Sequence, residues 1–490
     1  MTTSASSPLR ALAVKSAAWY GATRLWGQVL SWGVTIVLAR LLAPHDYGLF
    51  AIALSVLALL ELLQEFGLGT ALVQRQSLAR EQVNAVFWLL AGASLLLTAA
   101  TFLAADAISA FYGEPRLTWV LRILCLTFLV NSLGTVPYSL LTKAINLRRR
   151  SLAEAFGTTA SALVALWLAQ LGYGVWALVL GQLVRSVVLT GAMTCFAGWT
   201  PGLVADFRGI RHLLTFGLSM TGVHFVSTAS QAASTFILAR VLSSSAVGVY
   251  AMAQSLTEAP NRLSTAIINQ VSFPLFSRVQ EDRALLTASF LRISKYLVVI
   301  SFPVQIGLAL VAPDLIPLLL SAKWDGLILP FQILCLESVV VLSTLASSPL
   351  LTAVGRANLL FRRSVLSLVC LVGATLVGVP FGLVGVCIAR LIMTIPMRLA
   401  VLFPVFWELR LSPGAYARSL ASPAGATALM TVAVVLLRQA WPVQESRLEI
   451  LALSVLVGAL TYLVALFLLD RSLTGEVRTM VKDLISPAQA

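Results

Sequence analysis

Apolar runs of about 20 residues follow one another along almost the whole sequence. A helix of that length crosses the hydrocarbon core of a bilayer, and helical geometry pairs the backbone N–H and C=O groups that lipid cannot satisfy. The runs do not alternate in polarity, as residues 51–60 and 451–460 illustrate, so the strands of a membrane barrel are excluded. The sequence therefore predicts an all-α polytopic membrane protein.

Composition agrees with this prediction and limits the classes of partner. Hydrophobic residues make up 59% of the chain and charged residues 11%, against about a quarter charged in soluble domains. The formal net charge of +14 comes from Lys and Arg scattered between the apolar runs, so we expect no nucleic-acid partner. The five cysteines lack metal-type or redox-type spacing, and we expect neither a metal site nor a cofactor.

We expect 14 spans, divided among an N-terminal lobe (residues 1–200, six spans), a C-terminal lobe (residues 201–410, six spans) and residues 411–490, with two spans and a cytoplasmic tail. The first span is too long for the apolar region of a signal peptide, so it is expected to be retained. The spans fall at residues 17–38, 47–66, 85–105, 117–137, 152–171, 174–196, 213–238, 247–269, 293–312, 326–345, 364–380, 382–406, 423–440 and 449–470.

The distribution of basic residues predicts the orientation of these spans. Lys and Arg concentrate in cytoplasmic loops. With 14 spans and the N-terminus inside, the opposite side receives six of the 34 Lys and Arg residues, and most of the others fall on the cytoplasmic side. We therefore expect both termini to be cytoplasmic.

An internal repeat with an offset of 200 residues predicts the architecture. Residues 37–56 and 237–256 share eight identities, and the run Arg149-Arg150-Ser151 is echoed by Arg362-Arg363-Ser364. An even number of spans separates the first two copies, so they enter the membrane in the same direction. We expect two parallel six-helix lobes around a central cleft, which is where alternating-access transporters bind their substrate.

Ionisable side chains inside spans cost about 2.5–3.5 kcal/mol each and therefore mark candidate functional residues. The repeat aligns Arg24 with His224, so both lobes place a basic group at one position. An arginine keeps its charge and offers several donors to phosphate oxygens, although each one can equally pair with an acid or reach the interface. The candidates for binding substrate in the cleft are Arg24, His224, Arg262, Arg122, Arg185 and Arg390.

Three acidic residues in spans, Glu61, Glu258 and Glu337, are candidates for a second role. They can neutralise buried arginines, or they can titrate and couple transport to a cation gradient. No nucleotide-binding, zinc-type or hydrolase motif is present, and the expected external loops are short, so we do not expect an enzyme.

Three motifs carry a resemblance to a known family: VLARLLAPHDYG at residues 37–48, LLQEFGLGTALVQR at residues 62–75 and LGYGVW at residues 171–176. With them the chain resembles the Wzx-type polysaccharide flippases, in the colanic-acid-exporter-like branch of the multidrug/oligosaccharidyl-lipid/polysaccharide superfamily. The resemblance implies a bacterial inner-membrane transporter that flips an undecaprenyl-diphosphate-linked oligosaccharide from the cytoplasmic to the periplasmic leaflet. It also implies a role in exopolysaccharide, capsule or O-antigen (lipopolysaccharide) synthesis, with membrane lipids, a glycan polymerase and export machinery as partners.

Two alternatives remain, one with the same architecture and one from a different class of protein. A MATE-like cation-coupled antiporter of small molecules would need acidic cleft residues, and the excess of embedded arginine argues against it. A membrane glycan polymerase or ligase would need a large external loop with catalytic residues, and the sequence shows none.

Overall fold

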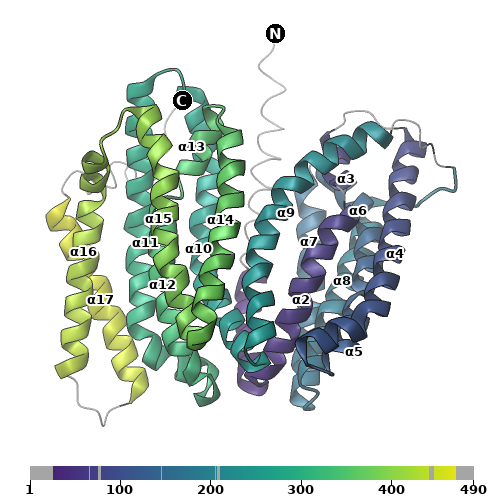
Figure 1. Ribbon diagram of the computed structural model, residues 1–490, viewed down its shortest axis with the longest axis horizontal. Helices are drawn as coiled ribbons and strands as arrows, with labels where there is room; N and C mark the ends of the chain where they lie inside the picture. Colours follow the sequence, from purple (N-terminus) through teal and green to yellow (C-terminus); the bar gives the residue numbers. More distant parts are fainter. Residues whose placement is uncertain are drawn as a thin grey trace. The chain divides into compact units, whose positions relative to one another are not determined.

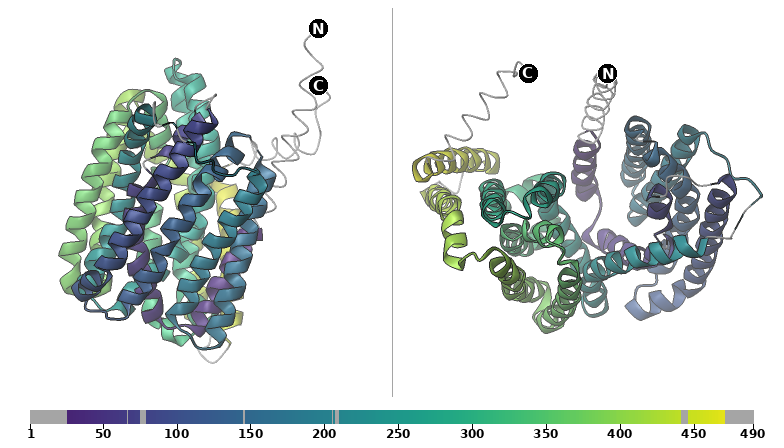
Figure 2. Two further views of the ribbon diagram at one scale, coloured as in Figure 1. Left: turned by 90° about the vertical axis from the view of Figure 1, so that its right-hand side faces the viewer. Right: turned by 90° about the horizontal axis from the view of Figure 1, so that it is seen from above.

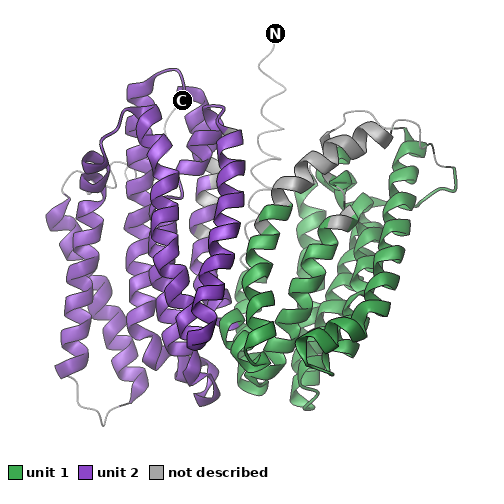
Figure 3. Cartoon of the chain, in the orientation of Figure 1, with its two compact units in different colours: residues 1–251 green, residues 252–490 purple. Residues whose placement is uncertain are grey.

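The computed structural model describes residues 26–65, 67–74, 79–144, 146–204, 206, 210–440 and 446–470. Every regular element in these ranges is a helix, which confirms the all-α fold. Ten stretches of the described residues are long and apolar enough to cross a membrane, and the total of 14 spans stays a prediction. The chain forms two compact units, unit 1 with residues 1–251 and unit 2 with residues 252–490 (Figure 3). The lobe boundary at residue 200 also stays a prediction.

Unit 1 is a bundle of helices, and several of its predicted spans lie on helices that continue past the apolar run (Figure 1). One example is α4, which begins at Arg80 and ends at Tyr112, where the left-handed backbone of the following Gly113 (φ 68°) closes the helix. The predicted span 117–137 is two helices, interrupted at Cys125. After a helix over residues 26–41, the elements are α2 (Pro44–Glu65), α3 (Leu68–Gln74), α4 (Arg80–Tyr112), α5 (Leu117–Leu124), α6 (Leu126–Lys143), α7 (Leu147–Gln170), α8 (Val175–Ala197) and α9 (Ile210–Val241).

Unit 2 begins inside α10, whose first turns belong to unit 1. Its helices also extend beyond the predicted spans, since α14 begins seven residues before residue 364 and α16 begins ten before residue 423. The elements are α10 (Ser244–Val279), α11 (Arg283–Leu320), η1 (Ala322–Leu327), α12 (Ile328–Ser343), α13 (Ser347–Ala353), α14 (Ala357–Gly378), η2 (Val379–Phe381), α15 (Gly382–Leu409), α16 (Pro413–Ala440) and α17 (Arg447–Leu469).

The last two helices, α16 and α17, lie side by side and pack on α11 (Figures 1 and 2). Two ion pairs fix them there. Arg438 of α16 lies 2.5 Å from Asp314 of α11, and Asp470 at the end of α17 lies 2.5 Å from Lys295 of α11. The pair that the repeat analysis leaves outside the duplication is therefore attached to unit 2 by buried and half-buried charges as well as by apolar packing.

Large apolar side chains face outward and small polar ones face inward, which is the arrangement expected when lipid is the solvent. Leu96 and Leu103 on α4 are 73% and 78% exposed. On the inner side, Ser94 of α4 donates to Ser132 of α6 across 2.9 Å, and both are buried. Small residues allow helices to approach closely and bond to one another where burial of apolar surface supplies no driving force.

The two copies of the repeat meet at equivalent residues. Helices α2 and α10 begin at Pro44 and Ser244, 200 residues apart, and cross at Gly48 and Gly248. A Cβ atom added to Gly48 would overlap the carbonyl of Ser244, and one added to Gly248 would overlap the carbonyl of Pro44. Such reciprocal contacts are those of two equivalent elements related by a twofold axis. The crossing therefore brings equivalent positions of the two copies of the repeat together.

A polar cluster lies beside this crossing. The Glu114 carboxylate, in the turn between α4 and α5, lies 3.6 Å from Nε2 of His45 and accepts a hydrogen bond from the Ser244 hydroxyl. Since His45 belongs to the first turn of α2 and Ser244 to the first turn of α10, one carboxylate joins the starts of both copies.

Candidate functional site

A polar cluster inside unit 2 contains two of the predicted residues. Glu337 of α12 is 8% exposed and lies 3.3 Å from Arg390 of α15, with which it forms an ion pair. Thr394, one turn further along α15, donates its hydroxyl to the same carboxylate at 3.0 Å. Structural pairing, one of the two roles that the sequence allows for Glu337 and Arg390, is therefore present in the structure.

A network of amide side chains lies next to this pair. Gln305 of α11 is 1% exposed and donates to the side-chain oxygen of Asn261 on α10 at 2.6 Å. Asn261 in turn donates to Ser338 of α12 at 3.1 Å. Because Ser338 follows Glu337 in sequence, polar contacts join α10, α11, α12 and α15 inside unit 2. Sequence reasoning missed the amides, since an uncharged Asn or Gln in an apolar run carries little signal on its own.

Arg262 and Glu258 lie on α10, one residue after and three residues before Asn261. Arg262 is exposed and makes no hydrogen bond or ion pair with another residue that the structure describes, whereas Glu258 is half-buried. Arg262 therefore remains a cation with free donors in a predicted span, which is what an anionic ligand requires.

The other cationic candidates fall into different environments. Arg122 pairs with Asp106 at 2.7 Å and lies over the rings of Phe102 and Trp119, so it is held at the surface of unit 1. Arg185 on α8 is exposed and has no hydrogen bond or ion pair to another described residue. Arg24 lies outside the described residues, as does the side chain of His224 on α9. The role of each of these residues in substrate binding stays a prediction.

Unit 1 contains a cavity of about 640 Å³ with Glu61 in its wall. The Glu61 carboxylate accepts a hydrogen bond from Asn131 of α6 at 3.3 Å. Other polar side chains of α6 line the same space, and Ser139 among them donates to the carbonyl of Gly69 at 3.2 Å. The cavity therefore combines an acid with hydroxyl and amide groups, and Asn131 is a candidate that the sequence does not single out.

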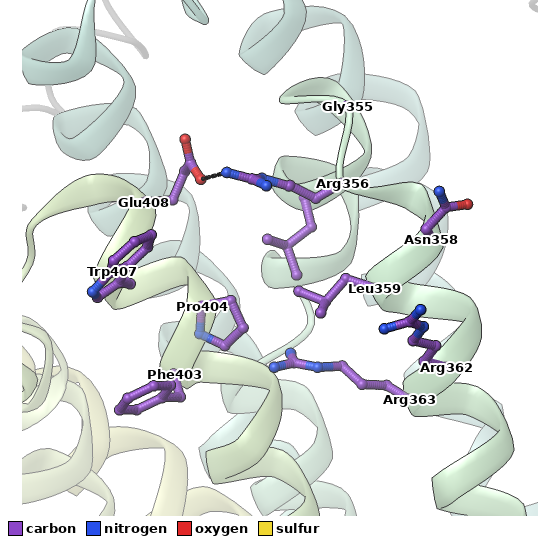
Figure 4. Close-up of a pocket in the computed structure, with 11 residues that line it drawn as sticks. Gly355, Arg356, Asn358, Leu359, Arg362, Arg363, Phe403, Pro404, Trp407 and Glu408 are labelled. Atoms are coloured by element: carbon purple, nitrogen blue, oxygen red, sulfur yellow. Dashed lines mark hydrogen bonds and ion pairs between the residues drawn. The ribbon is translucent and has the colours of Figure 1, made fainter.

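A basic pocket in unit 2, with a volume of about 610 Å³, is the second group that sequence reasoning missed (Figure 4). Three arginines and one glutamate line it, together with exposed aromatic side chains of α15. The pair Arg362-Arg363 is visible in the sequence as part of the repeat, but its partners come from α15, more than 35 residues away. The signal that could have found the site is a basic pair at a helix start facing the aromatic end of the next helix.

No set of three or more His, Cys, Asp and Glu side chains within the described ranges is arranged to hold a metal ion. What the described residues offer is a neutralised ion pair, a polar network and several exposed guanidinium groups inside helices that otherwise face lipid.

Comparison with known proteins assigns the family. Residues 37–329 match the family of polysaccharide biosynthesis proteins. The chain is 27% identical to the lipopolysaccharide biosynthesis protein WzxC of Escherichia coli (strain K12), over 73% of this chain and 74% of that protein. It is 26% identical to the succinoglycan biosynthesis transport protein ExoT of Rhizobium meliloti (strain 1021), over 70% and 69% of the two chains.

Solved structures define the fold. The lipid II flippase MurJ, in its inward closed conformation, superposes with a TM-score of 0.78, covering 93% of this chain and 99% of that one at 14% identity. At that identity the likeness concerns the fold alone. The family match covers more than half of the sequence, and this chain belongs to the family of polysaccharide biosynthesis proteins.

Proposed function

We propose that this protein is a flippase that transfers a polyprenyl-diphosphate-linked oligosaccharide from the cytoplasmic to the periplasmic leaflet of the bacterial inner membrane. The observation that carries the proposal is the family match over residues 37–329. Two relatives are named for lipopolysaccharide biosynthesis and for succinoglycan transport, and the matching fold is that of a lipid II flippase. The proposed cycle is alternating access, and the proposed product is a lipid-linked repeat unit for polysaccharide export.

The charges of the described residues support an anionic substrate. Arg185 and Arg262 are exposed and have no partner among the described residues, while the buried acid Glu337 is already paired with Arg390. A diphosphate needs cations that hold their charge in a poorly hydrated site, and guanidinium groups meet that need. A polyprenyl tail can remain in lipid throughout the transfer.

Removing the free guanidinium of α10 is expected to slow transfer. In proteoliposomes that contain a fluorescent polyprenyl-diphosphate oligosaccharide, Arg262→Ala should lower the rate of leaflet transfer about tenfold, because one charge-assisted hydrogen bond is worth about 1.5–3 kcal/mol. Arg262→Lys should retain part of the rate, since the charge remains but the fork of donors does not.

Arg283→Ala is the matched control for this variant. Arg283 is an exposed arginine at the start of α11, outside the predicted spans, and its loss should leave the transfer rate unchanged. A wild-type rate in Arg262→Ala would remove Arg262 from the substrate path. Absence of transfer in the wild-type protein, with polymerised glycan as the product instead, would contradict the flippase proposal.

The proposed orientation has its own test in a cysteine-free background. Tyr173, in the exposed turn between α7 and α8, should lie on the periplasmic side, and Arg148 near the start of α7 should lie on the cytoplasmic side. In intact spheroplasts, a membrane-impermeant maleimide should therefore label Tyr173→Cys and not Arg148→Cys. Both should react after the membrane is permeabilised, and the opposite pattern would invert the proposed orientation.

A further inference from the structure

The basic pocket of unit 2 lies between the start of α14 and the end of α15. Gly355, with φ of 77°, makes the turn that brings α13 into α14, and only a glycine adopts that conformation readily. The pocket is lined by Leu351, Gly355, Arg356, Asn358, Leu359, Arg362, Arg363, Phe403, Pro404, Trp407 and Glu408, and all of these except Leu351 are labelled in Figure 4.

Its charges do not balance. Arg356 lies 3.4 Å from the Glu408 carboxylate, which accounts for one of the three guanidinium groups. Arg363 donates one N–H to the carbonyl of Val401 at 3.0 Å, a contact that orients the side chain without neutralising its charge. Arg362 is exposed on the same helix. Three arginines against one glutamate leave two positive charges on the walls of this pocket.

The backbone at the start of α14 adds to the positive potential of this pocket. Helix α14 begins at Ala357, so its N-terminal turn, with Asn358 and Leu359, lies in the pocket wall. The first N–H groups of a helix have no acceptor within the helix and carry a partial positive charge, which favours anions. In Figure 4 the guanidinium group of Arg363 extends across the pocket toward Pro404, so side chain and helix start approach the same space.

The aromatic side chains of α15 indicate an amphiphile rather than a free ion. Phe403 is 72% exposed and Trp407 is 77% exposed, one turn apart on the same helix. Tryptophan is enriched where headgroups meet hydrocarbon, and basic pockets between membrane helices bind lipid headgroups. A ligand with a phosphate for the arginines and a hydrocarbon chain for the aromatics would satisfy both parts of the pocket.

We propose that this pocket binds the phosphate of a lipid, with Arg362 and Arg363 as its principal ligands. Arginine is suited to the role because its planar fork meets two phosphate oxygens at once. Two lipids carry that chemistry here, an anionic phospholipid of the bilayer and the polyprenyl diphosphate of the substrate. The second source rests on the proposed function, and the first does not.

Lipid binding to the purified full-length protein tests the proposal without any transport. Native mass spectrometry would measure the apparent affinities for phosphatidylglycerol, for a polyprenyl diphosphate and, as a neutral reference, for phosphatidylcholine. The variant Arg362→Ala/Arg363→Ala should bind at least one of the two anionic lipids about tenfold more weakly, with phosphatidylcholine unaffected. Glu408→Gln should tighten binding of the same lipid, because it releases Arg356 and removes a negative charge.

The matched control is Arg278→Ala/Arg283→Ala, which removes the same charge from two exposed positions of unit 2 on the same predicted side of the membrane. It should leave both affinities unchanged. Arg363 also donates to the backbone carbonyl of Val401, so its loss could affect folding as well as binding. The single variant Arg362→Ala keeps that contact and should still weaken binding severalfold.

The lipid whose affinity falls in the pocket variants identifies the source of the phosphate. Loss for phosphatidylglycerol alone identifies a phospholipid site, and loss for the polyprenyl diphosphate identifies a substrate site. Unchanged affinities for both lipids in the pocket variants, or equal losses in the control, would overturn the proposal. A wild-type protein that binds lipid here but transfers no oligosaccharide would instead contradict the flippase proposal and leave this site standing.

Discussion

Replacement of Arg390 by methionine should destabilise the folded protein by about 3–5 kcal/mol, because it leaves the Glu337 carboxylate buried without its cation. Both side chains are largely withdrawn from the surface, with exposed fractions, counted over the side-chain atoms alone, of 13% for Arg390 and 10% for Glu337. Thr394 would still donate one hydrogen bond, but a hydroxyl does not neutralise a charge. The measurement is the midpoint of thermal unfolding in detergent, with the fraction of monodisperse protein as a second readout.

A double variant tests whether the unpaired charge of Glu337 causes the loss of stability in Arg390→Met. Glu337→Gln/Arg390→Met removes both charges and keeps an acceptor for Thr394, so it should recover most of the lost stability. Arg262→Met changes an exposed arginine of α10 in the same way and should alter the midpoint little. Equal losses in the single and double variants would show that Arg390 contributes by packing, through its aliphatic stem, rather than by neutralising Glu337.

The helices could be predicted from the sequence because their cause is local. Each predicted span with described residues is helical over most of its length, since an apolar run has no other way to satisfy its backbone in lipid. Several helix ends could not be predicted, because hydropathy marks where hydrocarbon stops and these helices continue beyond it. Helix α10 runs to Val279, ten residues beyond the expected end of its span at residue 269.

The partners of the charged residues could not be predicted, because they are set by tertiary contacts. Glu337 and Arg390 are 53 residues apart, and the sequence left their pairing as one of two alternatives. Arg122 resembles a cleft residue in the sequence, yet the preceding helix α4 places Asp106 and the Phe102 ring beside it, and the Trp119 ring lies next to it from its own helix. A charged residue in an apolar run therefore identifies a position worth testing, and only the packing shows whether the charge is already paired within the protein.

The basic pocket is a second case in which the sequence does not show the surroundings of its charged residues. Arg362 and Arg363 appear in the sequence as the echo of Arg149 and Arg150, which suggests a shared feature of cytoplasmic loops. The fold gives the copies different surroundings. In unit 1, Arg150 pairs with Glu154 and lies over the Tyr138 ring, whereas Arg362 is exposed beside the aromatic end of α15. Duplication preserved the residues while their neighbours diverged.

The crossing of α2 and α10 leads to the second large expected effect. Gly48→Ala should destabilise the protein by about 3 kcal/mol or more, since the added methyl group overlaps the backbone carbonyl of Ser244, which cannot rotate away as a side chain could. The helices would have to separate, and that movement would also strain the contact of Glu114 with His45 and Ser244. Thermal unfolding in detergent, compared with wild type, measures the loss.

Gly92→Ala is the matched control, because Gly92 lies inside α4 with nothing within 4 Å of an added Cβ atom. That change should be neutral or stabilising by up to about 1 kcal/mol, as alanine is the better helix former. Similar midpoints for Gly48→Ala and Gly92→Ala would mean that the two helices do not cross this closely.

The reciprocal variant, Gly248→Ala, tests the symmetry of the crossing. Its methyl group meets the carbonyl of Pro44 as that of Gly48→Ala meets Ser244, so the two losses should be equal. The double variant should lose less than their sum, because helices that one methyl group has already separated leave room for the other. Strict additivity would mean that each helix adjusts on its own. The combination of equal single losses with a smaller joint loss is expected only if one shared contact between the two copies of the repeat resists both methyl groups.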